Sequence, residues 1–283
     1  MPRPTEGLGE GLQMDFGEIT SRGLVLLGCG KMGGAMLEGW LKGGLNPQSV
    51  WVLDPYPSEW VASQGVHLNE GLPEAPAMMV VAVKPQMMGD ALPQVAAKGG
   101  GGTVVLSIAA GTTIASFEEA FGAGTPVIRS MPNTPAAVGQ GITALIGNAL
   151  IGDQDMALAE TLLRAVGKTV RLEDEAQMDA VTAVSGSGPA YVFHLIETMA
   201  AAGEAEGLPA NLAMELALTT VAGAGSLAEA SDESASQLRI NVTSPNGTTQ
   251  AALEVLMDEA EGFPSVVGKA VAAAANRSRE LGK

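Results

Sequence analysis

Residues 24–33 read LVLLGCGKMG, an apolar run that passes directly into a GxGxxG pattern. Four consecutive apolar residues predict a buried strand, and the glycines predict the tight turn between that strand and a helix. Gly28 would permit the turn, Gly30 would let the backbone approach a pyrophosphate, and Gly33 would let the helix pack closely on the strand. The same pattern also occurs in strand–helix turns that bind nothing, so its meaning depends on the residues C-terminal to it.

The sequence after this turn keeps the spacing of a dinucleotide-binding unit. A helical stretch extends to about residue 41, a glycine turn comes next, and the apolar strand 50–53 precedes Asp54. An acidic residue about 20 positions beyond the glycines is expected to bind ribose hydroxyls, and it would repel a 2′-phosphate. No lysine or arginine follows until Lys84, so these residues favour NADH. Ser58 and Lys31 could still hold a phosphate, which leaves NADPH use open.

Further apolar runs alternate with helical stretches along the first part of the chain. The expected strands after the first are 50–53, 78–83, 103–108, 126–131, 142–146 and 168–172. This alternation predicts an α/β fold with a doubly wound parallel sheet, the Rossmann architecture. Ligands bind at the carboxyl ends of such strands, so residues 83–85 and 107–111 should line the cofactor cleft.

The chain divides into three segments by composition. Residues 1–22 contain several Pro and Gly and no periodicity, which predicts a flexible or loosely docked extension. Residues 23–172 form the predicted dinucleotide-binding domain, and residues 173–283 an all-helical domain. Its stretches 191–206 and 211–230 have wide apolar faces rich in small residues and Met. We expect these faces to be buried against a second copy of the chain, and a self-contained helical bundle is the alternative.

Composition excludes several classes of protein. The chain has 283 residues, a net charge of −16, one Cys and two His, so neither a disulfide framework nor a Cys/His zinc cluster can be assembled. The negative charge argues against nucleic acid as a partner. No apolar run approaches the 18 or so residues that a membrane helix needs, and no secretory leader is apparent, so we expect a cytoplasmic protein.

Two hydroxyl-rich segments stand before predicted helices. Residues 185–191 read SGSGPAY, and residues 242–249 read VTSPNGTT. Both fit ordinary helix caps, with Pro189 at a first helical position. The second segment carries four hydroxyls beside a positive helix end, which suits a small carboxylate ligand better than a simple cap.

These segments resemble pyrroline-5-carboxylate reductases over residues 24–280. The resemblance rests on five motifs in the right order, namely residues 28–33, 82–86, 129–135, 185–191 and 242–249. Asn246 stands where the family usually has glycine, and Asn tolerates the left-handed backbone that such a turn needs. The resemblance implies a Rossmann domain, a helical dimerisation domain that can build larger rings, and reduction of 1-pyrroline-5-carboxylate to L-proline by NAD(P)H, the last step of proline biosynthesis.

The resemblance also implies roles for individual residues. Thr249 would bind the ring nitrogen of the substrate and orient its C=N bond, and the substrate carboxylate would be held by the segment Val242, Ser244, Gly247 and Thr248. A protonated cyclic imine is electrophilic without a strong protein acid, so positioning should dominate the chemistry. With Asn69 and with Asn241, which could come from the partner subunit, the predicted cofactor set is Gly28, Gly30, Lys31, Met32, Gly33, Asp54, Asn69, Ala82, Val83, Lys84, Pro85, Ala109, Ala110, Gly111 and Asn241.

Two other functions remain open from the residues. A β-hydroxyacid dehydrogenase of related architecture would need a lysine as general acid–base, and beyond residue 173 the chain has only Lys269 and Lys283. A non-catalytic NAD(P)-sensing module would explain the glycines, but it leaves the hydroxyls of residues 242–249 without a role. His194, within an apolar helical stretch, is expected to be a core residue, and no partner is evident for His67.

Overall fold

The computed structural model describes residues 14–282, which form two compact units. The sheet unit contains residues 14–186 and 274–282, and the helical unit contains residues 187–273. The division at 186/187 lies beyond the predicted boundary at 172/173, because the helical segments 175–186 belong to the sheet unit.

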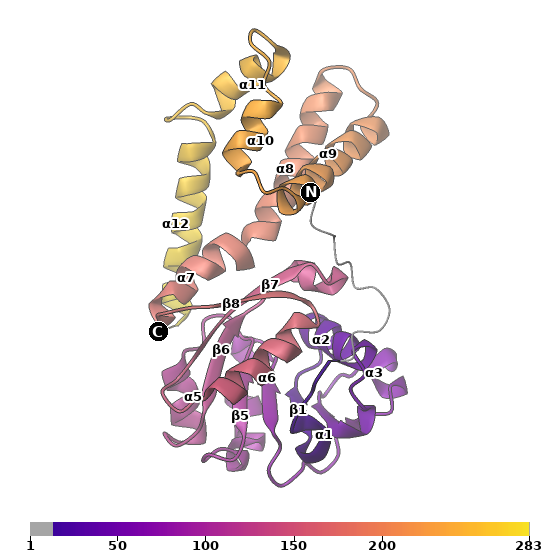
Figure 1. Ribbon diagram of the computed structural model, residues 1–283, viewed down its shortest axis with the longest axis vertical. Helices are drawn as coiled ribbons and strands as arrows, with labels where there is room; N and C mark the ends of the chain where they lie inside the picture. Colours follow the sequence, from indigo (N-terminus) through magenta and orange to yellow (C-terminus); the bar gives the residue numbers. More distant parts are fainter. Residues whose placement is uncertain (1–13, 283) are drawn as a thin grey trace. The chain divides into compact units, whose positions relative to one another are not determined.

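The sheet unit is built on an eight-stranded sheet in the order β3-β2-β1-β4-β5-β6-β7-β8 (Figure 1). The strand bounds are β1 Leu24–Leu27, β2 Val50–Leu53, β3 His67–Leu68, β4 Met78–Val81, β5 Val104–Ser107, β6 Val127–Met131, β7 Gly141–Gly147 and β8 Gly167–Arg171. The predicted doubly wound sheet is confirmed, and the order changes direction between β1 and β4. Strand β3 was not predicted, because two residues are too few to show alternation.

The predicted parallel sheet contains one antiparallel pair of strands. Strand β7 runs antiparallel to β6, while every other pair in the described sheet is parallel. The physical reason is the length of the connection. Residues 132–140 are fewer than the dozen or more that a parallel crossover requires.

Helices cover both faces of this sheet. One core cluster joins alternate strand residues such as Leu24 and Leu26 to α2 and α6, and a second joins Val25 and Leu27 to α4 and α5. Strand β1 is buried on both faces, as its unbroken apolar run predicts. The helices of this unit are α1 Ile19–Arg22, α2 Lys31–Lys42, α3 Glu59–Ser63, α4 Met88–Ala91, α5 Ile114–Phe121, α6 Asp153–Arg164 and α7 Met178–Val181, with a π-helix at Thr182–Gly186.

Residues 14–22 differ from the loosely held extension that was expected. Phe16 is 5% exposed and Ile19 is fully buried, and both belong to the first core cluster. Arg22 donates to the carbonyl oxygens of Ala75 and Pro76 and forms an ion pair with Glu18. This part of the segment is therefore integral to the sheet unit, whereas residues 1–13 of the predicted extension lie outside the described residues.

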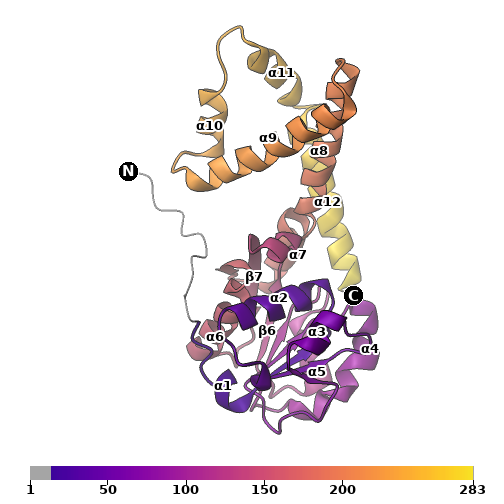
Figure 2. The same ribbon diagram turned by 90° about the vertical axis from the view of Figure 1, so that its right-hand side faces the viewer.

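The helical unit contains α8 Gly188–Ala205, α9 Ala210–Ala230, α10 Ala235–Asn241, α11 Thr248–Leu256 and the first part of α12 Phe263–Leu281. Helices α8 and α9 contact each other, and Figure 2 shows α9 running at an angle to α8. His194 is not a core residue in this chain, because its side chain is 80% exposed and its Nδ1 lies 3.2 Å from the Glu197 carboxylate on the surface of α8. Of the helices in residues 14–282, none combines the length and apolar character that crossing a membrane requires.

The end of α12 returns to the sheet unit. Ser278 donates to the Asp179 carboxylate at 2.6 Å, and Arg279 lies 4.0 Å from the same side chain. Leu281 lies against Gly111, in the loop after β5. The sheet unit is therefore assembled from two separate parts of the chain.

Candidate active site

The glycine-rich turn has the backbone geometry that its sequence predicts. Gly28 has φ +90°, and a Cβ there would lie 2.9 Å from the Val83 side chain. A Cβ on Gly33 would lie 2.6 Å from the Gly28 carbonyl oxygen. Around Gly30, in contrast, a Cβ would meet no heavy atom within 4 Å. Packing within the chain thus explains the first and third glycines, whereas the middle one faces open space at the start of α2.

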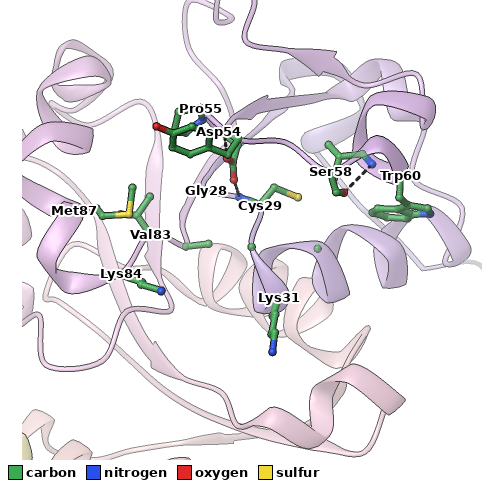
Figure 3. A pocket seen from close by; sticks show the side chains of 15 residues that line it. Gly28, Cys29, Lys31, Asp54, Pro55, Ser58, Trp60, Val83, Lys84 and Met87 are labelled. Atoms are coloured by element: carbon green, nitrogen blue, oxygen red, sulfur yellow. Dashed lines mark hydrogen bonds between the residues drawn. The ribbon is translucent and has the colours of Figure 1, made fainter.

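A cavity of about 560 Å³ opens beside this turn (Figure 3). It lies at the carboxyl ends of β1 and β4, where the strand order changes direction, which is the position expected for a ligand in this architecture. The lining residues are Gly28, Cys29, Gly30, Lys31, Gly34, Asp54, Pro55, Tyr56, Ser58, Trp60, Val61, Ala82, Val83, Lys84 and Met87. Seven predicted cofactor residues are among them, namely Gly28, Gly30, Lys31, Asp54, Ala82, Val83 and Lys84.

Asp54 connects the end of β2 to the glycine-rich turn. Its carboxylate accepts from the Cys29 amide at 2.6 Å and from the Tyr56 amide at 2.8 Å. Figure 3 shows the first of these bonds, with the carboxylate directed at the turn. A carboxylate has about four acceptor positions, so two bonds leave capacity for ribose hydroxyls. The negative charge predicted for this position therefore lies in the cavity wall.

The Cys29 thiol is held in its neutral form. Burial, reinforced by the nearby Asp54 carboxylate, raises the pKa of Cys29 from 9.0 to about 12. Since the thiolate is the reactive form of cysteine, this side chain is an inert part of the wall near neutral pH.

Several predicted cofactor residues do not line the cavity. Met32 packs against the first core cluster, Gly33 provides the close helix–strand contact, and Ala109 is buried. Asn69 bonds to the backbone of Asp54. Pro85 begins a 3₁₀ segment after β4. Ala110 and Gly111 belong to the loop after β5, and neither is among the residues that line the cavity.

The segment after β2 supplies lining residues that sequence reasoning missed. They are Pro55, Tyr56, Trp60 and Val61, and Met87 joins them from the segment after β4. Pro55 and Tyr56 directly follow Asp54 in the sequence, and that neighbourhood is the signal that could have found them, whereas no sequence signal identifies Trp60, Val61 or Met87. Ser58, named as a possible phosphate ligand, caps α3 by accepting from the Val61 amide at 3.3 Å and also lines the cavity.

The predicted substrate segment forms the turn between α10 and α11 in the helical unit. The Gly247 amide donates to the Ser244 carbonyl oxygen at 3.0 Å, and Asn246 has φ +58°. The left-handed backbone expected of Asn246 is thus confirmed. Thr248 and Thr249 occupy the first turn of α11, where backbone N–H groups have no partner within the helix. Ser244 and Val242 are exposed beside them.

Asn241 has partners within its own unit. Its side chain donates to Glu233 at 2.7 Å and accepts from Gln237 at 2.8 Å. These bonds hold the end of α10 immediately before the substrate segment. A contact of Asn241 with a cofactor therefore stays a prediction.

Metal-binding clusters of His, Cys, Asp and Glu are absent from residues 14–282. One buried cation forms an ion pair elsewhere in the sheet unit. Arg129, 5% exposed, donates to the Glu175 carboxylate at 2.6 Å, and the same carboxylate oxygen accepts from the Ile114 amide. This ion pair ties the start of α5 to β6.

The chain matches two family models, one in each part, and a curated relative over nearly its whole length. Residues 175–281 match the family model described as pyrroline-5-carboxylate reductase dimerisation, and residues 23–111 match that of NADP oxidoreductase, coenzyme F420-dependent. The pyrroline-5-carboxylate reductase of Pseudomonas aeruginosa is 40% identical over 264 residues, which cover 91% of this chain and 96% of that protein.

Solved structures give the same result. The pyrroline-5-carboxylate reductase of Coxiella burnetii superposes with a TM-score of 0.86 at 32% identity, covering 93% of this chain and 99% of the other. That of Plasmodium falciparum, solved with NADP bound, has a TM-score of 0.78 at 29% identity, covering 93% and 99%. On the strength of the full-length relatives, this chain belongs to the pyrroline-5-carboxylate reductase family.

Proposed function

We propose that this chain reduces 1-pyrroline-5-carboxylate to L-proline with a reduced nicotinamide dinucleotide, in the last step of proline biosynthesis. It is an NAD(P)H-dependent oxidoreductase that acts on a C=N bond. The observation that carries this function is the 40% identity to a pyrroline-5-carboxylate reductase across both units of the chain.

The residues around the glycine-rich turn fit a dinucleotide. The open space at Gly30 and the N-terminus of α2 suit the approach of a pyrophosphate to backbone N–H groups. Lys31 and Lys84 add positive charge to the same cavity. The cofactor, when bound, supplies the hydride from C4 of its nicotinamide ring. The residues of the chain bind and orient it, and we assign this task to residues 23–172.

NADH is the cofactor that Asp54 favours. Its carboxylate lies in the cavity wall at the end of β2, where it would accept from ribose hydroxyls and repel a 2′-phosphate. Lys31 and Ser58 line the same cavity and leave NADPH as a second, weaker cofactor. The Plasmodium falciparum relative was solved with NADP bound. We therefore base the proposed preference of this chain for NADH on its own residue Asp54 and not on that relative.

The substrate is assigned to the turn between α10 and α11, in the helical part that begins at residue 173. The Thr249 hydroxyl would bind the ring nitrogen and fix the direction of the C=N bond. The Ser244 and Thr248 hydroxyls, with the amides near Gly247 and the flank formed by Val242, would hold the carboxylate. The positive end of α11 favours that negative charge.

The helical unit is assigned to a homodimer, from which a larger ring can be built. The match to a dimerisation family supports this assignment. So do its exposed apolar side chains, which include Phe193, Leu216, Leu218 and Leu227 on α8 and α9. Asn241 of the partner subunit would complete the cofactor contacts.

The test is the absorbance of reduced nicotinamide, with purified protein, 1-pyrroline-5-carboxylate, and NADH or NADPH in parallel cuvettes. Faster decay with NADH is expected. Decay with NADPH alone would keep the reductase and refute the role of Asp54. No decay above the protein-free control with either cofactor would refute the reductase and favour a dinucleotide-sensing module. A β-hydroxy acid with NAD⁺ in a third cuvette tests the dehydrogenase alternative, which the lack of a suitable lysine disfavours.

A further inference from the structure

Asn69 has an unusual backbone for a side-chain-bearing residue. Within residues 14–282, Asn69 and Asn246 are the two non-glycine residues with positive φ, and Asn69 has φ +54°. It comes directly after the two-residue strand β3, and its amide donates to the Val52 carbonyl oxygen of β2 at 2.8 Å. Asn tolerates this backbone region better than most residues, so the position is conformationally demanding.

The side chain of Asn69 grips the backbone of a single residue. Its Oδ1 accepts from the Asp54 amide at 2.9 Å, and its Nδ2 donates to the Asp54 carbonyl oxygen at 2.8 Å. Both polar ends of the carboxamide are therefore used on Asp54. The pair of bonds fixes the peptide groups on either side of the Asp54 Cα, where β2 has already ended.

The Asp54 side chain extends this network into the cavity. Its carboxylate accepts from the Cys29 amide at 2.6 Å and from the Tyr56 amide at 2.8 Å. Asn69 itself is not among the residues that line the cavity, whereas Asp54, Cys29 and Tyr56 are. A continuous chain of hydrogen bonds thus joins β3 to the glycine-rich turn through Asp54.

We propose that Asn69 is a positioning residue for cofactor selectivity, because it holds the backbone of Asp54 so that the carboxylate faces the ribose end of the dinucleotide site. This inference rests on the proposed preference for NADH. A carboxylate discriminates against a 2′-phosphate only while its direction is fixed, because a side chain that is free to turn into solvent is screened by water. Without the grip of Asn69, Asp54 keeps its charge, but the backbone that carries the carboxylate loses two bonds, and the bonds of the carboxylate to the Cys29 and Tyr56 amides must hold its direction alone.

The test measures dissociation constants of NADH and NADPH by nucleotide fluorescence, in the full-length protein without substrate. The quantity compared is the ratio Kd(NADPH)/Kd(NADH). Asn69→Gly keeps the left-handed backbone and removes both bonds to Asp54. If fixing the carboxylate contributes about as much free energy to the discrimination between NADH and NADPH as one net hydrogen bond, the ratio should fall about fivefold in this variant. Asp54→Asn, which removes the charge, should lower it further.

A double variant separates positioning from direct contact. If Asn69 acts through the Asp54 charge, adding Asn69→Gly to Asp54→Asn leaves the ratio unchanged. If the double variant lowers the ratio again, Asn69 contacts the cofactor directly and the inference is refuted. If Asn69→Gly alone leaves the ratio at the wild-type value while Asp54→Asn lowers it, the inference also fails, although the preference for NADH stands. If Asp54→Asn itself has no effect on the ratio, the proposed preference for NADH through Asp54 is refuted, and the inference that depends on it is refuted as well.

Two further variants control for loss of structure. Gln48→Ala removes a 2.6 Å bond from a side-chain amide to the Gly65 carbonyl oxygen in the same region, without touching Asp54, and should leave the ratio unchanged. Asn69→Ala removes both bonds to Asp54 without adding a charge, so it should lower the ratio as Asn69→Gly does. A wild-type ratio for Asn69→Ala would refute the inference even if Asn69→Gly did not fold.

Discussion

Adding one methyl group to Gly33 or to Gly30 should have different consequences, although the two glycines are three residues apart. At Gly33 the new Cβ would lie 2.6 Å from the Gly28 carbonyl oxygen, and ordinary contact begins near 3.4 Å. The helix or the turn must therefore move by the difference, about 0.8 Å. Gly28 cannot yield easily, because the Val83 side chain and the Ala82 carbonyl group fill the space where a Cβ of Gly28 would lie.

The change in the free energy of unfolding caused by Gly33→Ala depends on two opposing effects. Overpacking a tight contact costs about 1–3 kcal/mol, and Gly→Ala within a helix gains about 1 kcal/mol. Because the obstructing atom belongs to the backbone, we expect Gly33→Ala to lose about 1–2 kcal/mol of unfolding free energy, and at about 2–4 °C per kcal/mol the Tm falls by several degrees. The displaced turn should also weaken NADH binding by roughly tenfold or more.

Gly30→Ala and Gly34→Ala are the matched controls. A Cβ on Gly30 meets nothing within 4 Å, so the Tm should change by at most a degree or two, while NADH binding falls because the methyl group occupies the space proposed for the pyrophosphate. A Cβ on Gly34 makes one ordinary contact at 3.8 Å, so that variant should gain about 1 kcal/mol from helix propensity alone. Circular dichroism melts and nucleotide fluorescence give both quantities. A Gly33→Ala protein as stable as Gly34→Ala, or a Gly30→Ala protein with wild-type affinity, would refute the reasoning.

Three other predictions concern separate parts of the chain. Thr249→Val should lower kcat with 1-pyrroline-5-carboxylate by about tenfold or more without changing the Tm, and full activity would show that its hydroxyl does not orient the imine. A hydrogen bond from Arg171, opposed by burial, holds the pKa of Glu160 below its ordinary 4.5, so this carboxylate stabilises the fold above about pH 4.5 and loses its contribution as the pH falls. Glu160→Gln should therefore be less stable than the wild type in urea at pH 7, and the gap should shrink at pH 3.5. Cys29, with its pKa raised to about 12, should react with iodoacetamide at pH 8 far more slowly in the folded protein than in urea, and equal rates would contradict its burial.

The sequence predicts the sheet well where apolar runs are long enough to be buried on both faces. Strand β2 lies at the expected residues, and β4 and β5 lie within two residues of them. The antiparallel direction of β7 could have been predicted from the short connection 132–140, which is too short for a parallel crossover. It was missed because the apolar periodicity used to find the strands carries no information about strand direction. Phe16 and Ile19 were missed because two buried side chains within a segment rich in Pro and Gly do not make a period.

The backbone geometry of the glycine-rich turn and the place of Asp54 at the end of β2 were predictable, since both depend on local sequence. The relation between Asn69 and Asp54 was not predictable, because it depends on the parallel pairing of β2 with β3, which brings together residues distant in the sequence. Tyr56 and Trp60 line the cavity through the path of one loop, and no spacing rule specifies such a path.

The return of residues 274–282 to the sheet unit bears on how the protein is made. During synthesis, domains generally fold from the N-terminus onward as they leave the ribosome. Here Ser278, the hydrogen-bond partner of Asp179, is translated only after all of residues 187–273. The contacts of the last turns of α12 with Asp179 and Gly111 are therefore the last that the sheet unit can form during synthesis, whereas both of its core clusters consist of residues translated before the helical unit.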